Sequence, residues 1–221
     1  MGMTEFTTAR RNMIDGQLRP GEVTDPAILD AMAALPRERF VPKALRGAAY
    51  CDEDIPLGDG RFLMKPLVLA RLLTMAEPTP GDVALVVGCA SGYDAAILAR
   101  LVATVVAVEC DPRLAGDADA ALSELGVDNA AVVEGPLAEG WAAQAPYDVI
   151  LFSGAARQVP QAILDQLGHG GRLVTVIRTS EFAPGRAELL LRGDGSVSRR
   201  IMYDAMVHML PGLAPAPEFV F

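Results

Sequence analysis

The stretch ALVVGCASGYDAAILARL, residues 84–101, combines an apolar run, two glycines and a helical segment. Gly88 and Gly92 frame a turn in which the missing Cβ atoms let the backbone pass close to a ligand. Glu109 ends the next apolar run, 21 residues after Gly88. This spacing is typical of a carboxylate that accepts hydrogen bonds from two ribose hydroxyls. The pattern therefore indicates a site for a nucleoside-like ligand.

Two alternatives compete with that interpretation. In a dinucleotide site the turn follows the pattern GxGxxG, but the sequence Gly-Cys-Ala-Ser-Gly-Tyr departs from it and lacks the third glycine, so a nucleoside is favoured. Alternatively, Gly88 and Gly92 only form a tight strand-to-helix turn, and Glu109 is a solvated acid at a strand end.

The spacing of the apolar runs after Pro80 predicts the strands and helices that position this turn. Runs without polar alternation are typical of parallel strands that are covered on both faces. Five of them alternate with helical stretches: VALVV, TVVAV, AAVV, YDVILF and RLVTVI. The segments AELLLR and RRIMYDAMV follow without an intervening helix, so we expect an antiparallel pair with a turn at residues 193–196. The sequence predicts an α/β fold with a doubly wound, mostly parallel, seven-stranded sheet.

The first part of the chain follows a different pattern. Residues 1–79 read as a helical N-terminal subdomain, and residues 80–221 as the α/β domain, the two packed as one unit. Asp25 and Pro26 predict the start of a helix over DPAILDAMAAL. The segment KPLVLARLLTMA predicts a second amphipathic helix, and IPLGDGRFLM between them predicts a loop or short hairpin.

Composition limits the class of protein. Half of the residues are hydrophobic, which is typical of a globular chain, and the formal charge of −9 disfavours nucleic acid as a partner. We expect neither a membrane span nor a secretory signal, and hence a cytoplasmic protein. Cys51, Cys89 and Cys110 lack metal-ligand spacing, so we expect no metal site and reduced, mostly buried thiols. We expect neither His169, at the end of a helix, nor His208 to be catalytic.

The motifs VVGCASGYDAAILARL and VVAVECD together resemble those of class I S-adenosylmethionine methyltransferases. They are most similar to the protein-L-isoaspartate O-methyltransferase family, whose version runs close to LEIGTGSGYQAAVLARL. The resemblance extends over nearly the whole chain and includes the Arg-x-x-Phe-Val-Pro segment at residues 37–42. It implies a Rossmann-like methyltransferase fold, S-adenosyl-L-methionine as cofactor, and repair of damaged proteins or peptides by methyl esterification of isoaspartyl carboxylates.

The resemblance also implies the site residues. The cofactor-binding positions would be Val86, Gly88, Cys89, Ala90, Gly92, Tyr93, Glu109, Gly135, Pro136 and Leu137. The catalytic, acceptor-side positions would be Met64 and Lys65. Because a carboxylate is already ionised at pH 7, its methylation needs no general base, and the catalysis consists mainly of positioning.

Four positions depart from the family pattern. Val86 replaces an acid, Ala90 replaces the middle glycine, Pro136 replaces the Asp of Gly-Asp-Gly, and Met64 replaces the Ser of Thr-Ile-Ser-Gln-Pro. A hydrogen bond to a charged group is worth about 1.5–3 kcal/mol, so Val86 and Pro136 should each weaken cofactor binding. Two other hypotheses stay open: a methyltransferase for another acceptor, and a degenerate pseudo-methyltransferase that acts as a binding or regulatory module. The oligomeric state is not predictable from the sequence.

Overall fold

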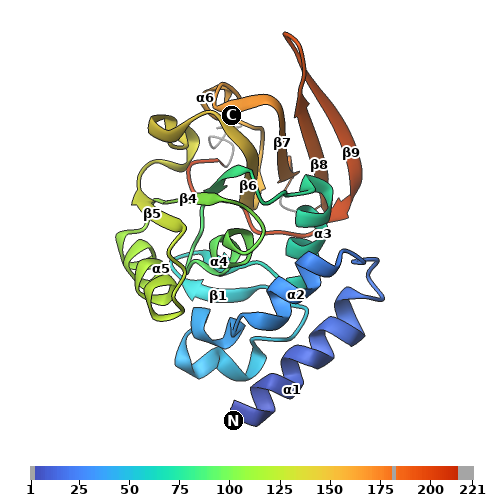
Figure 1. Cartoon of the computed structure of the whole chain (residues 1–221), viewed down its shortest axis with the longest axis vertical. Coiled ribbons are helices and arrows are strands. Elements are labelled where there is room, and N and C mark those ends of the chain that lie inside the picture. The colour runs from blue at the N-terminus through green and yellow to red at the C-terminus, as the bar shows by residue number, and fades with distance from the viewer. Residues whose placement is uncertain (1–2, 181–182, 214–221) are drawn as a thin grey trace, which may run out of the picture.

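The computed structural model describes residues 3–180 and 183–213. Its centre is a seven-stranded sheet with the order β5-β4-β3-β6-β7-β8-β9 (Figure 1). β3 to β7 run parallel, and β8 and β9 close one edge as an antiparallel pair. The strands are β3 Val83–Val87, β4 Thr104–Glu109, β5 Ala130–Glu134, β6 Tyr147–Ala156, β7 Leu167–Ile177, β8 Gly185–Arg192 and β9 Val197–Ala205. The predicted doubly wound sheet is confirmed, and so is the turn at 193–196, where the Gly193 amide donates to the Ser196 carbonyl.

The apolar strands form this sheet because both of its faces are buried. Along β3, Ala84 and Val86 face one apolar cluster, while Leu85 and Val87 face another. The first cluster is covered by α3 (Pro66–Ala76), α4 (Tyr93–Ala99) and α5 (Pro112–Glu124). The second is covered by α6 (Gln161–Leu164), the 3-10 turn Leu137–Glu139 and the chain around Leu210.

The N-terminal part packs helices below the sheet (Figure 1). It consists of α1 (Met3–Met13), a π-helical turn (Ile14–Leu18), α2 (Pro26–Ala34), two 3-10 segments (Arg37–Phe40 and Lys43–Ala48) and the hairpin of β1 (Ile55–Gly58) and β2 (Arg61–Leu63). Asp25 caps α2 as predicted, by accepting a hydrogen bond from the Ala27 amide. Residues 13–76 share one apolar cluster with the sheet, but the division of the chain at residue 79 stays a prediction.

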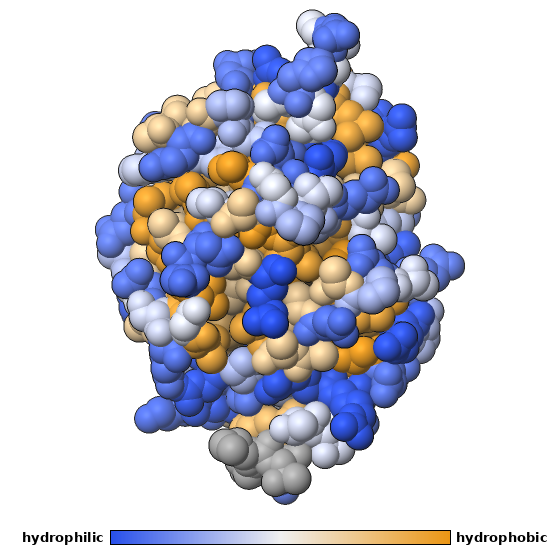
Figure 2. Space-filling model, in the orientation of Figure 1, coloured by the Kyte–Doolittle hydropathy of each residue, from blue (hydrophilic) through white to orange (hydrophobic). Residues whose placement is uncertain are grey.

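The surface is mixed in polarity. Hydrophilic residues dominate the upper and lower ends of the molecule, and apolar residues reach the surface between them (Figure 2). Of the described residues, no helix is long and apolar enough to span a membrane.

Two local expectations are wrong. Cys51 and Cys110 are exposed, and only Cys89 is buried, because the first two lie in loops rather than in the core. His169 does not end a helix. It lies in β7, where its exposed ring contacts Asp194.

The turn between β3 and α4 holds a non-glycine residue in the left-handed region. Ala90 has φ +51°, and its amide donates to Glu109. An L-residue with a Cβ atom pays about 1–2 kcal/mol for this conformation, and glycine avoids that cost while losing some entropy on folding.

We therefore expect Ala90→Gly to raise the free energy of unfolding by about 1 kcal/mol, as measured by urea denaturation. The matched control, Ala95→Gly inside α4, should lower it by about 1 kcal/mol or more. A loss of stability from Ala90→Gly would contradict the strain assigned to this turn.

Candidate functional site

The candidate site lies where the parallel strands β3, β4 and β6 end. Gly88 follows β3 with φ +76°, and its amide donates to the Val108 carbonyl. Gly92 precedes α4 with φ +91°, and a Cβ atom there would lie 3.0 Å from the Ala118 Cβ, so α5 packs directly on the turn. Ligands of open α/β sheets bind at this edge, beside the point where the strand order reverses.

Glu109 is the charged centre of this edge. Its side chain is completely buried, and both of its oxygens bind Arg61, at 2.8 Å each. One oxygen also accepts the amides of Cys110 and Asp111, and the other accepts the Ala90 amide at 2.7 Å. A carboxylate offers about four acceptor positions. The chain's own donors therefore saturate the group that was predicted to hold a ribose.

The crevice beside Gly88 is filled as well. A Cβ atom placed on Gly88 would lie 2.6 Å from Leu210 Cδ2, and one placed on Gly154 would lie 2.7 Å from the same atom. Leu210 thus occupies the space that these two glycines leave open between β3 and β6. Leu137, a predicted cofactor contact, also reaches this point, 3.3 Å from the same Gly88 position.

Backbone hydrogen bonds hold this segment in place. The Ala155 amide donates to the His208 carbonyl and the Leu210 amide donates to the Ala155 carbonyl, both at 2.8 Å. The cavity that remains between β6, Arg61, Met64 and residues 207–210 encloses about 10 Å³. A volume of that size holds about one water molecule.

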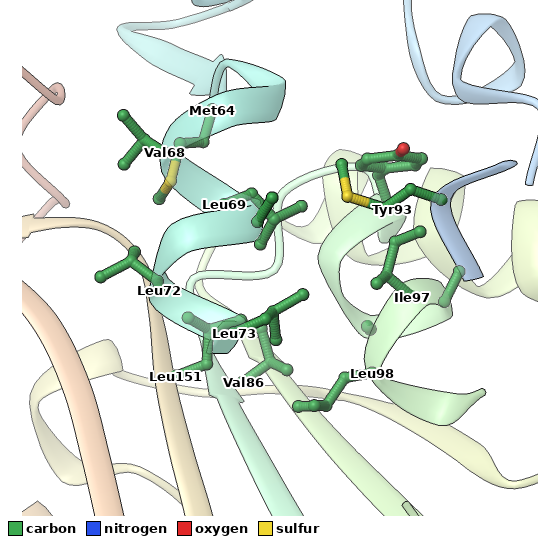
Figure 3. Close-up of a cluster of buried hydrophobic side chains, with 14 of the residues drawn as sticks. Met64, Val68, Leu69, Leu72, Leu73, Val86, Tyr93, Ile97, Leu98 and Leu151 are labelled. Atoms are coloured by element: carbon green, nitrogen blue, oxygen red, sulfur yellow. The ribbon is translucent and has the colours of Figure 1, made fainter. Parts of the chain in front are cut away.

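The other predicted cofactor positions are spread around this edge. Val86 is buried among Leu73, Leu98 and Leu151 in the apolar core (Figure 3). Cys89 is also buried, and burial raises the pKa of its thiol. Gly135 donates its amide to the Glu109 carbonyl, whereas Pro136 is exposed.

Tyr93 faces the N-terminal helices rather than the glycine turn. Its ring packs edge-on against Phe40, 5.3 Å between centroids, and lies 4.7 Å from the Arg37 guanidinium. Burial raises the pKa of its hydroxyl to about 12. Arg37, itself buried, donates to the carbonyls of Ala49 and Met64 and so anchors the loop that carries Met64.

The predicted acceptor-side positions, Met64 and Lys65, lie where α3 begins. Met64 is 2 % exposed and lines the small cavity. Lys65 is half-buried, and its backbone amide donates to Asp54. Asp54 in turn faces His208 at 3.7 Å, and burial raises the pKa of its carboxyl.

Arg61, His208 and Leu210 are the residues that sequence reasoning did not place in the site. The Phe62 and His208 rings stack in parallel, 3.5 Å between centroids, which joins the β1–β2 hairpin to the segment 207–210. No local spacing relates Arg61 to Glu109, 48 residues away, or Leu210 to Gly88. The only sequence feature that could have pointed to Arg61 was its positive charge in a turn-rich segment, and a charge in such a segment is more often solvated.

Comparison with solved structures matches this architecture to that of methyltransferases. One is a protein-L-isoaspartate O-methyltransferase with a TM-score of 0.81 at 24% identity, covering 93% of this chain and 67% of that one. Another, from Plasmodium falciparum, is described as a protein-L-isoaspartate O-methyltransferase in complex with S-adenosyl-L-homocysteine, with a TM-score of 0.78 at 17% identity and coverage of 91% and 97%. The fold is therefore that of a Rossmann-like methyltransferase.

Sequence comparison is more specific. The family model for protein-L-isoaspartate(D-aspartate) O-methyltransferase matches residues 8–204. A protein-L-isoaspartate O-methyltransferase of Roseiflexus castenholzii is 38% identical over 97% of both chains, and one of Gloeobacter violaceus is 39% identical over 84% of this chain and 90% of that protein. The chain belongs to the protein-L-isoaspartate O-methyltransferase family.

S-adenosylmethionine is the cofactor of this family, but the residues at the strand ends do not fit it in this conformation. Pockets for such ligands enclose about 300–1,000 Å³, against the 10 Å³ found here. Glu109, the predicted ribose carboxylate, is saturated by Arg61, and the space beside Gly88 is filled by Leu210.

One buried acid in this region gives a pH-dependent prediction. Asp94, at the start of α4, is 2 % exposed, and within the described part of the chain its Oδ1 has no hydrogen-bond partner. Burial raises the pKa of this carboxyl from 3.8 to about 6, although Ser153 and Arg37 lower it in part. Since the folded state holds the proton more tightly, this group stabilises the fold below pH ~4, and that stability is lost as the pH rises through about 6.

We expect Asp94→Asn to raise the free energy of unfolding at pH 7.5 by about 3 kcal/mol, because the asparagine carries no charge to bury. The gain should disappear below about pH 3, where Asp94 is protonated in both states. Urea denaturation across this range provides the measurement, with exposed Asp15→Asn as the control. A gain that is independent of pH would contradict the assignment.

Proposed function

We propose that this chain is an S-adenosylmethionine-dependent methyltransferase that esterifies the carboxylates of isoaspartyl residues in damaged proteins or peptides. The observation that carries the proposal is the family match over residues 8–204, which includes the acceptor-side loop as well as the glycine turn. Damaged proteins as partners, no nucleic-acid or membrane partner, and a cytoplasmic location belong to the same proposal.

The acceptor side of the site supports an anionic substrate. Lys65, His208 and Arg37 all lie near Asp54, which accepts the Lys65 amide at the start of α3. The role that we propose for these groups is orientation, because the acceptor is already ionised at pH 7.

A second candidate function is a binding module without catalysis. The saturated carboxylate of Glu109 and the position of Leu210 favour it, because both occupy contacts that a nucleoside would need. Transfer of a labelled methyl group to an isoaspartyl peptide, compared with the matching aspartyl peptide, separates the two candidates. Transfer specific to the isoaspartyl peptide supports the enzyme, and no transfer at millimolar S-adenosylmethionine supports the module.

Met64 provides a more specific test of the acceptor side. Its thioether cannot donate a hydrogen bond to an acceptor carboxylate, whereas a serine hydroxyl can. We expect Met64→Ser to raise kcat/KM on the isoaspartyl peptide about tenfold, the equivalent of one hydrogen bond. The dissociation constant for S-adenosyl-L-homocysteine should stay unchanged.

The same substitution on the surface, Met202→Ser, is the control, since Met202 lies half-exposed on β9. An unchanged kcat/KM for Met64→Ser would show that the acceptor is oriented by other residues.

A further inference from the structure

We propose that this chain closes its own cofactor site. Arg61 takes the place of a ribose on Glu109, residues 207–210 fill the adjoining crevice, and S-adenosylmethionine binds only after both have moved. The inference rests on the proposed function, because it concerns the regulation of the same site.

The first closing contact is the guanidinium of Arg61. It is 4% exposed and binds both oxygens of Glu109 and, at 3.1 Å, the carbonyl of Gly88. It therefore joins the ends of β3 and β4, the two strands that a nucleoside would have to bridge. A planar guanidinium that donates to both oxygens of a carboxylate presents the same pair of donors as the two hydroxyls of a ribose.

The second closing contact is the segment 207–210. It pairs with Ala155 at the end of β6 through two backbone hydrogen bonds, and it directs Leu210 onto Gly88 and Gly154. A ligand that used the open faces of these glycines would overlap with Leu210. The segment therefore excludes a ligand from the crevice beside Gly88.

Both contacts come from parts of the chain that can move while the sheet stays intact. Arg61 lies on the separate two-stranded β1–β2 sheet, and residues 207–210 follow the last strand. The stacked rings of Phe62 and His208 connect the two parts. This contact makes a joint movement of the hairpin and the segment the simplest way to open the site.

Titration calorimetry with S-adenosyl-L-homocysteine tests the closure. We compare the native chain with Arg61→Gln, Leu210→Ala and the double variant. Each single variant should bind at least tenfold more tightly than the native chain, and the double variant more tightly than either. Replacing a residue whose role is only structural would lower the affinity or leave it unchanged.

Matched controls are present in the same fold. Arg199→Gln alters another pair of arginine and buried glutamate, on β9 and β8, and Leu190→Ala removes the same side-chain atoms from the same apolar cluster as Leu210. Neither should change the affinity. If Arg61→Gln does not fold, which thermal unfolding without ligand will show, Leu210→Ala still tests the closure with the ion pair intact.

Low-micromolar binding by the native chain would overturn the closure and leave the proposed function standing. Absence of binding in every folded variant would also overturn it, because the site would then be lost rather than closed. Tight binding by the variants without methyl transfer to an isoaspartyl peptide would support the closure and contradict the proposed function.

Discussion

The rest of the site depends on one constraint: the buried charge of Glu109 must be compensated. Removing one partner from a buried ion pair typically costs about 3–5 kcal/mol, since the other charge is left without compensation. The chain meets this requirement with Arg61 and with three backbone amides, so the glycine turn, the start of α5 and the β1–β2 hairpin all converge on one carboxylate. The position of the N-terminal hairpin against the sheet follows from this convergence.

The departures from the family pattern are consistent with a site that is organised around its own side chains. Val86 packs against Leu73 and Leu151, so a carboxylate at this position would be buried against the apolar side chains that Figure 3 shows. Ala90 accepts a strained φ while its amide still reaches Glu109. Neither residue prevents the hydrogen bonds that hold the turn, since the amides of Gly88 and Ala90 still donate to Val108 and Glu109.

The sequence predicts the sheet well because strands buried on both faces need apolar residues throughout, and this pattern is local. It also predicts that Gly88 and Glu109 meet, since consecutive parallel strands end at one edge of the sheet. It does not predict Arg61 on Glu109 or Leu210 on Gly88. Arg61 lies in the first third of the chain and Leu210 near the end of the described residues, while Glu109 and Gly88 lie between them. Only tertiary packing brings these residues together. The exposure of Cys110 was missed for a local reason, because the strand ends one residue before it.

Stability and ligand binding compete for the same groups in this arrangement. A bound nucleoside must replace the hydrogen bonds that Arg61 donates to Glu109. It must also replace the apolar contacts that Leu210 makes in the crevice between β3 and β6. Only the surplus over these displaced contacts contributes to affinity. Substitutions that open the site should therefore tend to weaken the fold, which is the common relation between stability and activity. In this chain the relation has a definite origin, because the groups that complete the core at the strand ends are the groups that exclude the ligand.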